Sequence, residues 1–293
     1  LRGLYPNVAS INILTVGGST TDQRYISDGL TFQGVMMNQF KKVNKDVYVV
    51  NAGVDGQSTF GHIKNFDWWF PYIPNLNPDF FLFYIGVNDF YKDSHSTFDI
   101  LKINESTNIV TAIKTRIKIK SVFYYFYRVI EGMLSVNVHG LNHNKAVFSM
   151  NNWTDIPLQT DDYNIIMRNH LNSYTQRLHI LMEKVIAFNS KAIFVSQSKR
   201  RNYDIINGQL VATSDTQQYN QYIINGIDYY HMSRLLNAHT KSVCDAYKEC
   251  IFFDLDEELT FNIETDFYDS IHTTLSGSKK IGEYLFNKLN SYY

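Results

Sequence analysis

Proline and cysteine are both scarce in this chain, which has 5 prolines and 2 cysteines in 293 residues. The two cysteines, Cys244 and Cys250, cannot by themselves supply the ligands of a structural zinc site. They are either two reduced thiols or the two ends of one small disulfide loop, because sequence spacing does not give the Cα separation that a disulfide requires. The sequence also shows no internal repeat, low-complexity tract or interdomain linker.

An excess of charge of either sign is absent as well. Lys and Arg total 27 against 28 for Asp and Glu, which gives a net charge of -1. No positive field draws a phosphate backbone to such a protein, so general nucleic-acid binding loses its main physical support. We expect no nucleic-acid partner.

Long hydrophobic runs are also missing. No stretch reaches the ~18 uncharged apolar residues that cross a bilayer. The densest stretch, residues 122–138, contains Arg128 and Glu131. We therefore expect the chain as given to be soluble, although a leader or an anchor could precede Leu1.

Hydrophobic residues, by contrast, make up 44% of the chain and aromatic residues 15%. This content excludes a disordered protein, because too much of the chain must be shielded from water. The length suits one large α/β domain or two small ones, and without a linker we expect a single domain over residues 1–293.

Five short runs are nearly continuous in apolar residues, as strands covered on both faces are. They span residues 11–16, 47–51, 80–85, 192–197 and 251–254. Between the runs, apolar residues recur at helical spacing at Phe32, Met36 and Phe40 and at Met167, Leu171, Tyr174, Leu178, Leu181 and Val185. After the last run, Ile281, Leu285 and Leu289 have the same spacing. The alternation predicts parallel strands with right-handed crossovers and helices on both faces.

Residues 91–161 do not fit this alternation and are too long for a plain loop, so we interpret them as an insertion. A basic stretch, Lys114, Arg116, Lys118 and Lys120, leads directly into the aromatic residues 122–127. We interpret this pattern as a basic helix face followed by the core of the insertion. The alternative is a segment that rests on a membrane surface or closes over a site.

Ligands of open parallel sheets bind beyond the carboxyl ends of the strands. After the first run comes Gly17-Gly18-Ser19, which places a hydroxyl and an N–H at a sharp turn. The loop after the second run contains Gly56, and the turn after the third contains Asn88. Each of these three signals also fits an ordinary turn.

A fourth signal follows the fifth run, where Asp269 precedes His272 by three positions. An imidazole that accepts a hydroxyl proton needs a carboxylate to fix its tautomer, and Asp269 is close enough in sequence to provide it. Taken alone, the pair is weak evidence, since any one of nine histidines is more often structural than catalytic.

The four signals in this order resemble the four blocks of the SGNH (GDSL-type) hydrolase superfamily. The resemblance implies an α/β fold, a flavodoxin-like three-layer α/β/α sandwich with a mainly five-stranded parallel sheet. It implies a nucleophile at Ser19, a base at His272 oriented by Asp269, and an oxyanion hole formed by Ser19 N–H, Gly56 N–H and the Asn88 amide. It implies no cofactor and no metal ion.

The sequence departs from the family pattern at one position, where Gly18 replaces the aspartate of Gly-Asp-Ser. The role of that aspartate therefore does not transfer. Gln197, at the end of the fourth run, either lines the pocket or begins a solvated basic loop with Lys199, Arg200 and Arg201.

The resemblance implies a serine esterase that acts through an acyl-enzyme. We expect hydrolysis of a small O-acyl ester, an O-acetyl group on a carbohydrate or surface polysaccharide, because an aromatic-rich insertion can stack on sugar rings. A lipid-type esterase with Lys114 to Tyr127 as its lid and an O-acyltransferase are the alternatives with the same triad. Family members often act outside the cytoplasm or on envelope material, and a Cys244–Cys250 bridge would agree.

Other classes explain fewer residues. A metal hydrolase needs three convergent ligands, and His139 and His143 lie four apart without an H-E-x-x-H motif. A nucleotide-binding flavodoxin-like protein would share the fold class but leave Asp269 and His272 without a function. A non-catalytic carbohydrate-binding module would have no physical reason to keep the nucleophile, base and donors together.

Overall fold

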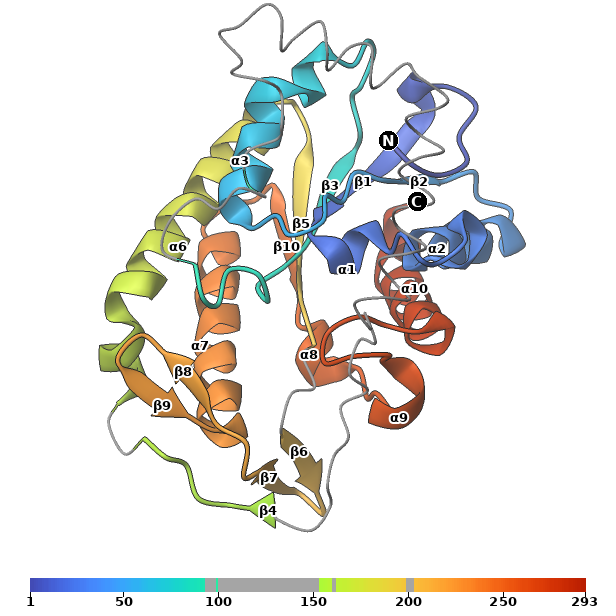
Figure 1. Cartoon of the computed structure of the whole chain (residues 1–293). Coiled ribbons are helices and arrows are strands. Elements are labelled where there is room, and N and C mark those ends of the chain that lie inside the picture. Colours follow the sequence, from blue (N-terminus) through green and yellow to red (C-terminus); the bar gives the residue numbers. More distant parts are fainter. Residues whose placement is uncertain (93–98, 100–152, 160–161, 199–202) are drawn as a thin grey trace, which may run out of the picture.

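The computed structural model describes residues 1–92, 99, 153–159, 162–198 and 203–293. Its centre is a five-stranded sheet in which all paired strands are parallel, in the order β10-β5-β3-β1-β2 (Figure 1). The strands are β1 (Ile11–Gly17), β2 (Tyr48–Asn51), β3 (Phe80–Ile85), β5 (Lys191–Ser196) and β10 (Cys250–Phe253). The five predicted strands are confirmed, with bounds shifted by one residue at several ends.

Helices cover both faces of this sheet, as the alternation predicted (Figure 1). One layer contains α2 (Phe32–Lys42) and α10 (Leu275–Leu289), and the other contains α3 (Thr59–Trp68), α6 (Tyr163–Ala187) and α7 (Gly226–Asp245). The three-layer α/β/α sandwich is therefore confirmed.

The pleat of β3 explains why both faces are covered. Phe81 and Phe83 are buried in the cluster that includes α3, α6 and α7, whereas Phe80, Leu82 and Tyr84 are buried in the cluster with α2 and α10. Successive side chains of a strand point to opposite faces, so an all-apolar strand supplies both cores.

The predicted stripe of α6 is buried along its whole length, from Met167 to Val185. The predicted stripes of α2 and α10 are buried too. Thr31 is the N-cap of α2, and its side chain accepts a hydrogen bond from Gly34 N–H. Such caps satisfy amide groups that a helix start leaves unpaired.

Shorter elements complete the described fold. Three short helices, α1 (Ser19–Asp22), α8 (Leu255–Glu258) and α9 (Ile263–Asp266), follow strands or their loops. Two small antiparallel sheets lie low in Figure 1 and consist of β4 (Trp153–Thr154), β7 (Gln209–Thr213) and β6 (Tyr203–Ile206), and of β8 (Gln217–Tyr219) and β9 (Tyr222–Ile224). The sequence analysis missed these sheets because their strands are short and partly exposed rather than continuously apolar.

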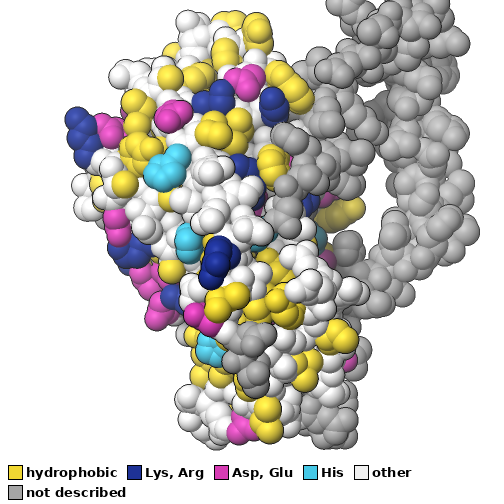
Figure 2. Space-filling view, turned by 90° about the vertical axis from the view of Figure 1, so that its left-hand side faces the viewer, with side chains coloured by type: hydrophobic (Ala, Val, Ile, Leu, Met, Phe, Trp, Pro, Cys, Tyr) yellow, Lys and Arg dark blue, Asp and Glu magenta, His cyan; other side chains and the backbone are white. Residues whose placement is uncertain are grey.

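Most of the predicted insertion, including Lys114 to Tyr127, lies outside the described residues, as do residues 199–201. No helix within the described ranges is both long and apolar enough to cross a membrane. On the side of the molecule that carries α6, acidic, basic and hydrophobic side chains are interspersed (Figure 2).

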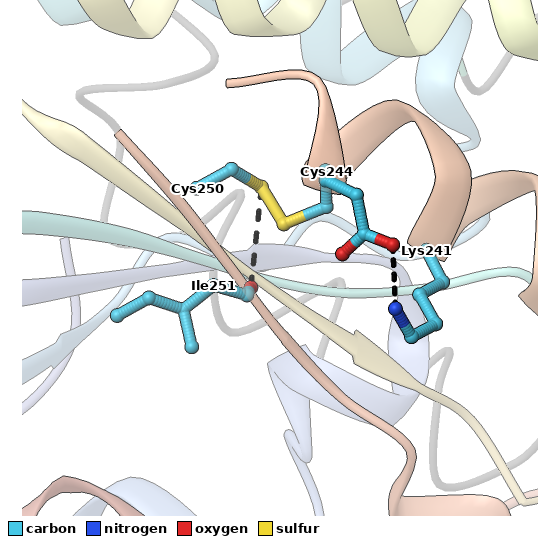
Figure 3. Close-up of a disulfide and its surroundings, with 5 residues drawn as sticks. Lys241, Cys244, Cys250 and Ile251 are labelled. Atoms are coloured by element: carbon cyan, nitrogen blue, oxygen red, sulfur yellow. Dashed lines mark hydrogen bonds and ion pairs between the residues drawn. A yellow bond between two sulfur atoms is a disulfide. The ribbon is translucent and has the colours of Figure 1, made fainter. Parts of the chain in front are cut away.

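The two cysteines form a disulfide that joins Cys244, near the end of α7, to Cys250, the first residue of β10 (Figure 3). The Cα atoms are 5.1 Å apart, within the range that a disulfide spans. Of the two alternatives for these cysteines, the structure therefore has the bridge. It lies at the amino end of β10, whereas ligands of such sheets bind at the carboxyl ends.

Replacing both Cys244 and Cys250 by alanine is expected to lower the free energy of unfolding by about 2 kcal/mol, because the unfolded chain regains the freedom that the small loop restricts. Urea unfolding measures the difference in free energy between three samples, which are the variant, the untreated wild type and the reduced wild type. Activity per folded molecule should stay unchanged. Equal stability of oxidised and reduced wild type would show that the bond does not restrict the unfolded chain.

Candidate active site

The described site lies at the carboxyl ends of β1 and β3, where the strand order reverses. From β1 the chain moves to β2 on one side and then to β3 on the other, and ligands of open α/β sheets bind at such switch points. Ser19 is the first residue of α1, directly after β1, and Gly18 is its N-cap. The Ser19 N–H is thus one of the amides that a helix start leaves without an intrahelical partner.

Three predicted side chains form one line of hydrogen bonds. His272 Nε2 lies 2.8 Å from Ser19 Oγ, and His272 Nδ1 lies 2.6 Å from Asp269 Oδ2. The imidazole is 19% exposed and the carboxylate 14%, and Ser19 is half-buried. The three side chains are therefore partly shielded from water but remain accessible to a ligand.

The Asp269 carboxylate is fixed on its other oxygen. Asp269 Oδ1 accepts hydrogen bonds from the backbone N–H groups of Ile271, at 2.8 Å, and His272, at 2.7 Å. Burial alone raises the pKa of Asp269, but the hydrogen bonds from the His272 side chain and these two amides outweigh it and lower the pKa below its usual value. Asp269 therefore stays ionised beside the imidazole.

An aromatic ring supports the imidazole from one side. The Tyr268 and His272 rings are stacked, with centroids 5.5 Å apart and planes 8° from parallel. Burial first, and then the nearby Asp269 charge, raises the pKa of Tyr268 to about 12. Tyr268 is thus neutral at ordinary pH and restricts the tilt of the imidazole ring.

Asn88 and the Gly56 loop also meet beside Ser19. Asn88 Nδ2 donates a hydrogen bond of 2.8 Å to the carbonyl oxygen of Gln57, the residue after Gly56. Gly56 has a φ of 75°, a left-handed conformation that favours glycine. The Gly56 carbonyl accepts a hydrogen bond of 2.8 Å from Lys92 Nζ. The structure thus brings the loop after β2 and the turn after β3 together.

Gly18 lies directly under the Asn88 amide. A Cβ atom at position 18 would be 2.2 Å from Asn88 Nδ2 and 3.1 Å from the Gln57 carbonyl oxygen. The first distance is a steric clash, so an aspartate at this position would displace the amide. The departure from Gly-Asp-Ser therefore has a steric reason in this chain.

Gly18→Ala is expected to push the Asn88 amide away from Gln57 and, if Asn88 stabilises an oxyanion, to lower kcat by about a hundredfold. Ester hydrolysis by this variant and by Asn88→Ala measures the effect. The double variant should lose little more than either single one, because both changes act on the same amide. An active Gly18→Ala enzyme together with an inactive Asn88→Ala enzyme would contradict this explanation of Gly18.

The sequence analysis missed Gln23, which connects two parts of the site. Gln23 Nε2 donates a 2.9 Å hydrogen bond to Thr273 Oγ1, the neighbour of His272, across 250 positions of sequence. Its other amide atom accepts from Phe32 N–H and Ser278 Oγ at 2.9 Å each. Gln23 therefore links the segment that carries Ser19 to the segment that carries His272. Glutamine in a loop gives no sequence signal of this kind.

Gln197 lies between two segments of the site. Its Nε2 donates to Thr20 Oγ1 at 2.6 Å, and its Oε1 accepts from Val87 N–H at 2.8 Å. These partners are the neighbours of Ser19 and Asn88. Gln197 thus joins the ends of β1 and β3, whereas Lys199, Arg200 and Arg201 lie outside the described residues.

The described residues contain no group of three or more His, Cys, Asp or Glu side chains that could hold a metal ion. His139 and His143 lie outside them.

No protein-family model matches this chain, and no curated protein matches its sequence. Solved structures do match it. TesA superposes with a TM-score of 0.51 at 11% identity, covering 96% of this chain and 99% of that chain. A variant of an acetyl xylan esterase from Geobacillus stearothermophilus superposes with a TM-score of 0.51 at 12% identity, covering 96% of each chain. A catalytic mutant of the same acetyl xylan esterase gives 0.51 at 11% identity, covering 96% and 94%.

Proposed function

We propose that this chain, which has the fold of the SGNH hydrolases, is a serine esterase that removes a small acyl group from a carbohydrate. The observation that carries the proposal is the line of hydrogen bonds from Ser19 Oγ through His272 to Asp269, at 2.8 and 2.6 Å. A serine hydroxyl is a poor nucleophile until a neighbouring base takes its proton, and this line supplies the base and its orienting carboxylate.

In the first step, Ser19 Oγ attacks the ester carbonyl carbon while His272 Nε2 accepts the hydroxyl proton. Asp269 stabilises the resulting imidazolium and remains ionised. The negative charge that develops on the carbonyl oxygen is stabilised by Ser19 N–H, Gly56 N–H and the Asn88 amide. Because an amide nitrogen carries two hydrogens, Asn88 can donate one to Gln57 and the other to this oxygen.

When the tetrahedral intermediate collapses, the bond from carbon to the alcohol oxygen breaks and His272 gives its proton to the leaving alcohol. An acyl group then remains on Ser19 Oγ. In the second step, water attacks the same carbon while His272 takes a proton from it. The bond from carbon to Ser19 Oγ then breaks, His272 returns the proton to Oγ, and the free acid leaves. If a sugar hydroxyl replaces water, the same residues transfer the acyl group.

Two observations support a carbohydrate ester as substrate. Two of the structures with the same fold are forms of an acetyl xylan esterase. On the described part of the chain, Tyr25 is 77% exposed, and it lies close enough to Tyr268 to affect the pKa of that side chain. An exposed aromatic ring near the triad gives a sugar a surface on which to stack.

Turnover of p-nitrophenyl acetate, butyrate and octanoate tests the reaction, and release of acetate from acetylated xylan and other acetylated glycans tests the substrate class. We expect acetate to be the best of the three acyl groups and an organophosphonate to stop turnover. Preference for octanoate would favour the lipid-type alternative. No hydrolysis of any ester, together with no labelling by the phosphonate, would exclude the proposed reaction.

A further inference from the structure

Two adjacent links join the turn after β3 to the segment that runs from the loop after β2 into α3. In the first, Asn88 Nδ2 donates to the Gln57 carbonyl oxygen at 2.8 Å. In the second, Asp89 Oδ1 accepts from Thr59 N–H at 3.0 Å and from Thr59 Oγ1 at 2.5 Å. Because Asn88 and Asp89 are neighbours, the second link limits how far the first can move.

The second link is completed by a cation from a neighbouring helix. Arg177, on α6, donates from Nε to Thr59 Oγ1 at 2.6 Å, and its guanidinium lies 3.6 Å from Asp89 Oδ1. The guanidinium is also held by Ser173 Oγ at 2.8 Å and lies over the ring of Phe60, 4.1 Å from the centroid.

Both charged side chains are almost completely buried. The Asp89 side chain is 1% exposed and the Arg177 side chain 5%. Burial raises the pKa of Asp89, and the Thr59 hydroxyl and the Arg177 charge oppose that rise. A buried carboxylate without a counter-charge takes up a proton or moves out of its buried position. Arg177 therefore favours the ionised form of Asp89, the form that accepts the hydrogen bonds from Thr59.

We propose that Arg177 is a positioning residue for the oxyanion hole: through Thr59 and Asp89 it holds the Asn88 amide at the position that the substrate oxygen requires. The inference rests on the proposed esterase function. The inference gives helix α6, which does not reach the reacting atoms, a positioning role in catalysis. A displacement of about 1 Å at such a site can cost about a hundredfold in rate.

Arg177→Lys tests this role, since lysine keeps the charge but cannot donate in the same planar pattern to Thr59 and Ser173. We expect kcat to fall at least about tenfold with KM within about twofold, because the oxyanion forms only in the transition state. Arg168→Lys, an exposed position on the same helix, is the matched control and should behave as wild type.

A double-mutant cycle separates positioning from general stabilisation. In the Asn88→Ala background, Arg177→Lys should lower kcat by no more than about twofold, because the amide that it positions is already gone. Losses that multiply in the double variant would overturn the inference. So would a folded Arg177→Lys enzyme with wild-type kcat.

Thr59 provides a second test if Arg177→Lys does not fold. Thr59→Val removes the hydroxyl between Arg177 and Asp89 at nearly constant volume, and Thr59→Ser restores it. We expect Thr59→Val to slow both ester turnover and phosphonate labelling of Ser19, and Thr59→Ser to recover most of both rates. Equal rates in the two variants contradict the inference. The proposed function fails separately, if the wild type itself neither hydrolyses esters nor reacts with the phosphonate.

Discussion

Replacing Ser19 by alanine is expected to lower kcat at least about ten-thousandfold and to abolish labelling by an organophosphonate. Under the proposed mechanism the Ser19 oxygen forms the bond to the acyl carbon, and no other atom of the described site can take its place. Ser19 is half-buried at the first turn of α1, so loss of one hydroxyl should hardly change the free energy of unfolding. Turnover of p-nitrophenyl acetate and thermal unfolding measure the two effects.

Ser27→Ala is the matched control for this substitution. Ser27 is an exposed serine shortly after α1, and its replacement should leave both turnover and labelling unchanged. Mass spectrometry of the phosphonate-treated wild type should locate the added mass on the peptide that contains Ser19. Label on another serine, or substantial turnover by the alanine variant, would remove Ser19 from the role of nucleophile.

The sequence predicts this fold well because the sheet is buried on both faces. An all-apolar run such as residues 80–85 can only be a strand covered twice or a buried helix segment, and its length favours the strand. The candidate triad could be located for a related reason, since parallel strands bring the residues after them to one edge. Because Ser19 follows the first strand, Asp269 and His272 are expected at the same edge of the sheet.

The contacts that hold the site together could not be predicted in the same way. Arg177 and Thr59 are separated by 118 positions, and Gln23 and Thr273 by 250. Their side chains meet only through the packing angle of a helix or the path of a loop, and sequence periodicity does not determine either. The small sheets of β6 to β9 were missed because half-exposed strands of three to five residues carry too few apolar positions to show a period.

Asp269→Asn is expected to lower kcat by about ten-thousandfold with little change in KM. The backbone N–H groups of Ile271 and His272 both donate to Asp269 Oδ1, so an asparagine must place its oxygen there and its NH₂ group against His272 Nδ1. Nδ1 then accepts a hydrogen bond, and the neutral ring carries its proton on Nε2, facing Ser19. In that tautomer the ring cannot take the Ser19 proton. Asp55→Asn, which removes a half-exposed carboxylate of the Gly56 loop, is the control for a simple loss of negative charge.

The pH profile of the wild type provides an independent check on the state of Asp269. Its pKa lies below the ordinary value, so the Asp269 carboxylate stays ionised as the pH falls toward the ordinary range of carboxyl groups. Protonation of the base His272 alone should then remove activity, and log(kcat/KM) should fall on the acid side with a slope of one. A slope of two would mean that the carboxylate takes up its proton in the same range, and the hydrogen bonds to Asp269 would then not hold it ionised. A profile without an acid limb would contradict the assignment of His272 as the base.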